Sequence, residues 1–84
     1  MLKELTRAWP EVSGDDELLG GVLRDVGHAC ATLDADGLRE VRNFLANASV
    51  GSERRSGMLV GAIELLDGYR DALREAIRKN DQAQ

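Results

Sequence analysis

Apolar residues recur at alternating steps of three and four along almost the whole chain, which is the spacing of amphipathic helices. The first such stretch runs from Leu2 to Val12. Pro10 interrupts it, and proline has no backbone N–H to donate within a helix. Because the residue before a proline also disfavours the helical conformation, we expect the first helix to span residues 2–9.

Two further amphipathic stretches follow, separated by turn-forming residues. The first predicts a helix over 15–33, which Ser13 or Asp15 would cap. The second predicts a helix over 35–48, with Asp34 as its N-cap. The segment "DADG" contains part of a calcium-loop pattern, but it lacks the ligand spacing of an EF-hand, so it is interpreted as a helix start.

The last stretch is the most regular in the chain and predicts a helix over 53–79. Its apolar seam keeps the alternating spacing from end to end: Leu59, Ala62, Leu66, Tyr69, Leu73 and Ala76. Glu64 stands within this helix beside apolar residues, and if it were partly buried it would pair with Arg42 or Arg55.

No stretch alternates with the period of a β-strand. The 84 residues are enough for one domain, and short loops favour antiparallel packing of consecutive helices. The predicted fold is therefore all-α: a small up-and-down helical bundle of three main helices, with the short N-terminal helix beside them, in a single domain over 1–84.

Glycines interrupt the long C-terminal helix at Gly57, Gly61 and Gly68. Each one destabilises a helix interior by about 1 kcal/mol relative to alanine. Their spacing places them on one side, and Gly20 and Gly27 do the same in the second helix. We interpret them as sites of close helix approach, either between these two helices or between two copies of the last one. The alternative is drift in a GC-rich genome.

Length gives a second indication of self-association. At about 1.5 Å per residue, the last helix spans roughly 40 Å and the second roughly 28 Å. If their starts are level, about two turns of the last helix protrude, carrying Leu73, Ala76 and Ile77. An exposed apolar stripe marks an interface, so we expect a second chain there. The alternative is that the helix frays after Ala72.

The net charge is −4, and eight of the 15 acidic residues lie within the first 37 positions. This balance argues against nucleic-acid binding, which needs a clustered basic surface, and suits a basic protein partner. A helix-turn-helix DNA binder remains a minor alternative, because the third helix offers only Arg39 and Arg42.

Candidate chemistry is sparse. Cys30 is the only cysteine, which excludes an intrachain disulfide and fits a reducing compartment. His28 is the only histidine, and it points to a different side of its helix from Cys30. We therefore expect no catalytic residues, no metal site and no cofactor. No apolar run is long enough to span a membrane, so we expect a cytoplasmic protein.

Two short motifs resemble a known group of proteins. "WPEV" at 9–12 and "ERRSGMLVGAIELL" at 53–66, with Arg55 nine residues before Glu64, are similar to short all-helical bacterial proteins of uncharacterised function. Some of these are presumed immunity proteins encoded beside toxins. The resemblance implies a helical fold and a toxin as protein partner.

Two polar patches complete the set of candidate sites: "DDE", which is Asp15, Asp16 and Glu17, and "ERR", which is Glu53, Arg54 and Arg55. In an antiparallel bundle they would lie at the same end. We hypothesise that they bind a partner, although each also reads as a solvated helix start. The sequence thus favours a non-catalytic protein-interaction module, with toxin immunity as its specific form. The alternative is a homodimeric structural or regulatory subunit that associates through the last helix.

Overall fold

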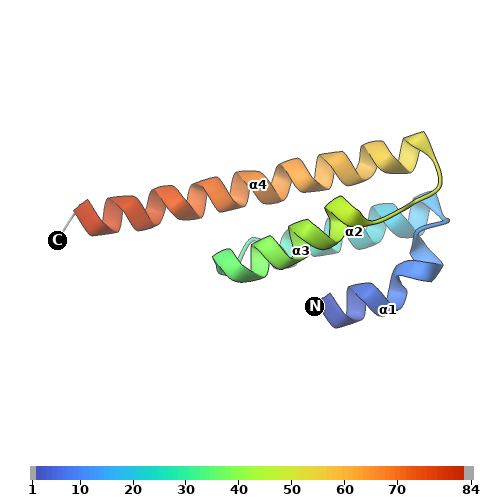
Figure 1. Ribbon diagram of the computed structural model, residues 1–84, viewed down its shortest axis with the longest axis horizontal. Helices are drawn as coiled ribbons and strands as arrows, with labels where there is room; N and C mark the ends of the chain where they lie inside the picture. The colour runs from blue at the N-terminus through green and yellow to red at the C-terminus, as the bar shows by residue number, and fades with distance from the viewer. Residues whose placement is uncertain (1, 83–84) are drawn as a thin grey trace.

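The computed structural model describes residues 2–82, which form four helices and no strand. They are α1 (Leu2–Val12), α2 (Asp16–Cys30), α3 (Ala35–Asn47) and α4 (Glu53–Gln82). Successive helices run in opposite directions, as Figure 1 shows, so the architecture is the expected all-α up-and-down bundle. The longest dimension of the molecule is 49 Å, because α4 extends well beyond the other helices.

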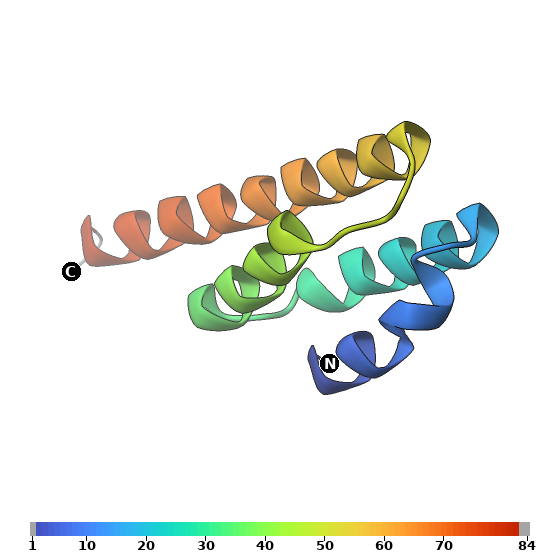
Figure 2. The ribbon, with the colours of Figure 1, turned by 45° about the vertical axis from the view of Figure 1, so that its right-hand side comes forward.

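The core lies where α2, α3 and α4 face one another, and α1 covers it from one side (Figure 2). Among the residues that the structure describes, it contains no buried charged side chain. Leucines dominate because the chain has few aromatic side chains to bury. The buried apolar residues are Leu5, Val12, Leu19, Leu23, Val26, Cys30, Leu38, Val41, Leu45, Val50, Leu59 and Leu66.

Side-chain caps fix the starts of three helices. The Asp15 carboxylate accepts a hydrogen bond from the Leu18 amide at 3.0 Å, and the Asp34 carboxylate accepts one from the Gly37 amide at 2.8 Å. At the start of α4, the Ser52 hydroxyl accepts from the Arg55 amide at 3.2 Å. These caps satisfy amides that would otherwise lack a partner at the first turn of each helix.

The first helix continues through Pro10 to Val12, three residues beyond the predicted end. The Ser13 amide still donates to the Trp9 carbonyl at 2.9 Å, so the helix resumes after the proline. Val12 is buried, and the Trp9 ring meets Phe44 edge-on with centroids 5.2 Å apart. This packing offsets the hydrogen bond that proline cannot donate, and α1 bends part-way along its length (Figure 2).

The second helix is shorter than predicted, since residues 31–33 form a turn rather than its last helical turn. In that turn the Leu33 amide bonds the Cys30 carbonyl at 3.1 Å. The chain must reverse here, because Asp34 takes an extended conformation to cap α3. The fourth helix runs to Gln82, three residues past its predicted end.

Candidate interaction surface

The two polar patches come together at one end of the bundle. The Arg55 guanidinium lies 3.1 Å from the Asp16 carboxylate and also donates through Nε to the Val50 carbonyl at 2.6 Å. The Arg55 side chain is only 20% exposed. Arg54 lies 3.7 Å from the same carboxylate. Arg55 thus joins the start of α2 to the loop before α4, and these contacts stabilise the fold.

The other acidic members of the patches face solvent. Asp15, Glu17 and Glu53 are exposed and form no ion pair within the part of the chain that the structure describes. Asp15 is already used as the cap of α2. The patches therefore keep an acidic surface at this end, although their central carboxylate, that of Asp16, is neutralised by arginines of the same chain.

The starts of α2 and α4 are level, since Asp16 lies beside Arg55. α3 runs back along α4, with Arg42 against Asp67 at 3.2 Å. α3 begins seven residues before Arg42, so it reaches only to about residue 74 of α4. We call residues 73–82 the α4 tail; beyond about residue 74 it projects past both neighbouring helices (Figure 1).

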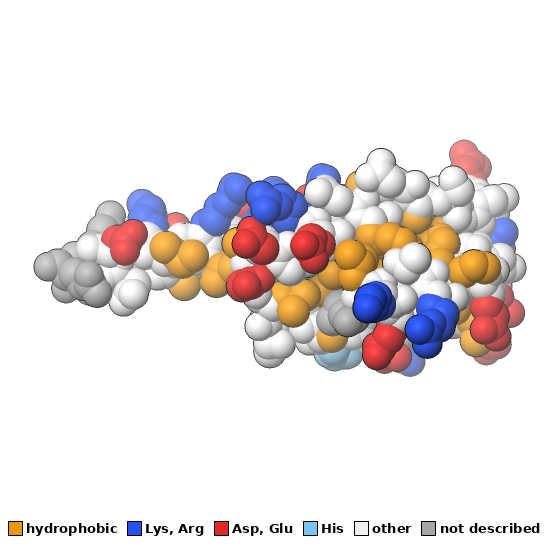
Figure 3. Space-filling model, turned by 60° about the horizontal axis from the view of Figure 1, so that its bottom comes forward, with side chains coloured by type: hydrophobic (Ala, Val, Ile, Leu, Met, Phe, Trp, Pro, Cys, Tyr) orange, Lys and Arg blue, Asp and Glu red, His pale blue; other side chains and the backbone are white. Residues whose placement is uncertain are grey.

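The tail carries the end of the apolar seam that is buried further back. Leu59 and Leu66 of this seam are 5% and 2% exposed. Along the tail Leu73 is half-buried, Ala76 is exposed and Ile77 is 52% exposed. Figure 3 shows hydrophobic side chains on the projecting part of the molecule, between charged ones. The tail thus presents Ala76 and Ile77 as apolar surface that the rest of the described chain leaves uncovered, whereas Leu73 still packs against the core.

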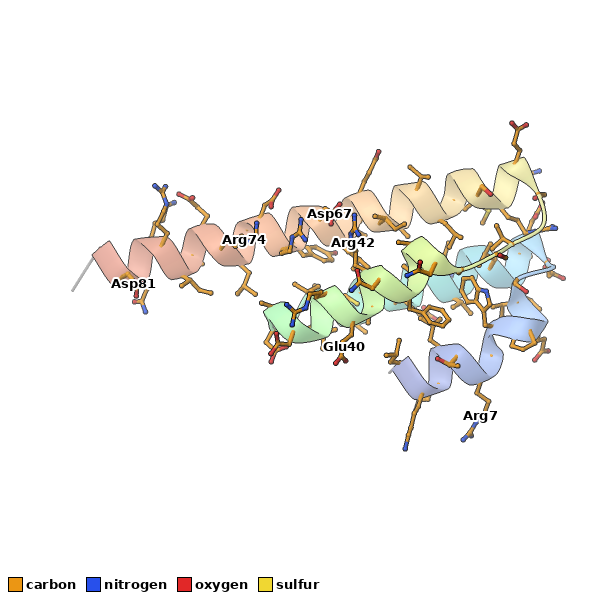
Figure 4. The ribbon with its side chains drawn as sticks, in the orientation of Figure 1. Arg7, Glu40, Arg42, Asp67, Arg74 and Asp81 are labelled. Atoms are coloured by element: carbon orange, nitrogen blue, oxygen red, sulfur yellow. The ribbon has the colours of Figure 1, made fainter. Side chains whose placement is uncertain are left out.

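Within the described residues, some charged side chains of α4 form ion pairs and others do not. Arg78 pairs with Glu75 at 2.5 Å, and Arg70 shares the Asp67 carboxylate with Arg42. By contrast, Arg74 and Asp81 form no ion pair within residues 2–82. Figure 4 shows both of them on the tail, beyond the end of α3.

Glu64 does not form the ion pair that partial burial would have required. It is exposed, and the arginines considered for it, Arg42 and Arg55, pair with Asp67 and Asp16 instead. The reason is its position on the outer side of α4, away from the core seam.

The glycines divide into two groups. A Cβ on Gly20 would lie 3.3 Å from Met58, and a Cβ on Gly27 would lie 2.9 Å from Leu65, so these two glycines of α2 admit side chains of α4. Gly57, Gly61 and Gly68 face open space, with nothing within 4 Å of an added Cβ. The expectation that the α4 glycines make the close contact with α2 was therefore wrong, because they lie on the outer side of the helix.

Two open grooves flank α1, and the sequence analysis did not identify them. One, of about 370 Å³, is lined mainly by apolar residues of α1 and α2. The other, of about 560 Å³, lies between α1 and α3, beside Trp9 and Phe44. Both arise because α1, which is short and bent, covers only part of the surface that the longer helices α2 and α3 present. Their only sequence signal is the position of Pro10.

The candidate nucleophile, Cys30, and the imidazole of His28 do not come together in one site. Cys30 is fully buried in the core, and burial raises the pKa of its thiol. His28 is exposed on the outside of α2. Over residues 2–82 no group of three His, Cys, Asp or Glu side chains is arranged to hold a metal ion. Nor is any helix in this range long and apolar enough to cross a bilayer.

Comparison with known proteins leaves the structure as the guide to function. No family model, no curated protein and no solved structure matches the chain.

Proposed function

We propose that this chain is a non-catalytic protein-interaction module whose contact surface is the α4 tail. The observation that carries the proposal is the uncovered end of the seam: Ala76 and Ile77 are exposed and Leu73 is half-buried, while Leu59 and Leu66 of the same helix are buried. Without a partner, this apolar surface would remain in water, on a part of α4 that projects beyond the other helices. Exposed apolar surface rimmed by charges is typical of protein contact sites.

The polar end of the bundle supports the same function less strongly. Glu17 and Glu53 keep an acidic surface there, which would attract a basic partner over distance. A toxin is one such partner, as the sequence resemblance implies, and immunity is then the specific form of the proposal. We favour the tail, because Arg55 and Asp16 are engaged with each other.

The proposal is tested by affinity capture from the native cell, with the purified protein as bait. The decisive variant is Ile77→Glu, which places a charge in the exposed seam. Its matched control is Val60→Glu, since Val60 is 55% exposed on the same helix but lies outside the tail. Partners retained by the wild type and the control but lost by Ile77→Glu support the proposal. Capture that is equal for all three proteins contradicts it.

A further inference from the structure

We propose that the partner of the α4 tail is a second copy of this chain, packed antiparallel along the tail about a two-fold axis beside Ile77. This inference rests on the proposed function, because it names the molecule that covers the same surface. It follows from the helical positions of the exposed apolar residues, from the unpaired charges beside them and from the space past α3.

The seam of α4 provides the contact. Leu66, Tyr69, Leu73, Ala76 and Asn80 follow alternating steps of three and four, so they form one stripe. Its first part packs within the bundle, and Leu66 is only 2% exposed. Ile77 lies at the edge of the same stripe and is the most exposed large apolar residue of the tail. An antiparallel copy centred there brings Ile77 against Ile77 of the second copy and buries both.

The charges select the direction of packing. Arg74 and Asp81 are seven residues apart, nearly two helical turns, so they lie on the same side of α4. They flank Ile77 almost symmetrically, and neither has an ion-pair partner within residues 2–82. In an antiparallel pair about Ile77, Arg74 of each copy faces Asp81 of the other. A parallel pair would instead place Arg74 beside Arg74, and like charges oppose association.

The space past α3 accepts this arrangement. When Ile77 lies opposite Ile77, residue 82 of the second copy comes opposite about residue 72. α3 reaches only to about residue 74, so the end of the second helix overlaps the bundle by no more than about half a helical turn (Figure 1). Ala76 and Asn80 face each other across the seam. The small alanine permits the helix axes to approach closely.

The contact is short, and this sets its strength. The tail is about 15 Å long, so the interface falls below the roughly 1,200 Å² of a standard stable complex. We therefore expect a weak, reversible monomer–dimer equilibrium rather than a permanent dimer. Two exposed ion pairs contribute to it, so added salt weakens the dimer.

The inference is tested by sedimentation equilibrium on the full chain, from low to high micromolar concentration. The variants reverse or exchange the charges at Arg74 and Asp81. Asp81→Arg and Arg74→Asp each set like charges opposite one another twice per dimer, and each weakens association by about tenfold. The double variant Arg74→Asp with Asp81→Arg restores it. The matched control is Asp71→Arg, which makes the same charge change on the outer side of α4, where Asp71 is exposed, and leaves association unchanged.

Three results would overturn the inference: a wild-type protein that stays monomeric at high micromolar concentration, a double variant as weak as the single ones, or association unaffected by Ile77→Glu. All of these positions are exposed, and circular dichroism checks that each variant keeps its helices. A monomeric protein that still captures another partner through Ile77 would show that the partner is not a second copy. The proposed function would then still hold. Loss of Ile77-dependent capture together with a monomer would overturn both.

Discussion

Replacing the three outward glycines of α4 by alanine should stabilise the protein. Gly57, Gly61 and Gly68 lie inside a continuous helix, and nothing is within 4 Å of the methyl group that each substitution adds. Alanine in a helix interior is favoured over glycine by about 0.5–1 kcal/mol, because it restricts the unfolded chain more. The free energy of unfolding should therefore rise by about 1.5–3 kcal/mol for the triple variant.

The assay is thermal or urea unfolding followed by circular dichroism at 222 nm. For a domain of this size each kcal/mol shifts the Tm by about 4–8 °C, so the triple variant should melt at least about 6 °C higher. Gly27→Ala is the matched comparison. Its added methyl would lie 2.9 Å from Leu65, whose half-exposed side chain must rotate away, so its gain should be smaller. A triple variant that is no more stable than the wild type would refute the placement of these glycines in open space.

Three further outcomes follow from single contacts. Arg55→Ala removes the bonds to Asp16 and to the Val50 carbonyl, and should lower the free energy of unfolding by about 1–3 kcal/mol in urea titrations. Asp34→Ala removes the cap of α3 and should lower it by about 1 kcal/mol, measured in the same way. Because burial raises the pKa of the Cys30 thiol, the unfolded thiol ionises first as pH rises past about 8.5. Stability should then fall as the pH rises above this value, and the Cys30→Ala variant should show a shallower fall.

The sequence predicted the helices well because each one buries a single apolar stripe. The stripe from Leu59 to Ala76 has one phase throughout, so no other secondary structure could bury it. Asp34 indicated the start of α3 in the same direct way, because a carboxylate at that position satisfies an amide of the first turn.

The sequence failed where local and tertiary effects compete. Pro10 favours ending α1, but the burial of Val12 and the packing of Trp9 against Phe44 carry the helix past it. The conformational preference of proline concerns only the local backbone. It does not include the free energy gained when residues of the next helical turn are buried.

The candidate surface was predictable in outline and not in detail. Helix lengths alone indicated that Ile77 would protrude. The pairing of charges was not accessible, because Arg74 has Asp71 three residues before it and yet forms no ion pair within residues 2–82. Similarly, the glycines of α4 share one side, but their spacing cannot say whether that side faces α2 or water.

The proposed dimer requires that the α4 tail is a helix and that a second copy covers it. Amide hydrogen exchange of residues 74–81, measured by NMR at low and at high micromolar concentration, tests this directly. We predict that protection of these amides rises with concentration, while that of α1 does not change. Tail amides that exchange as fast as those of an unstructured peptide at both concentrations would contradict the account.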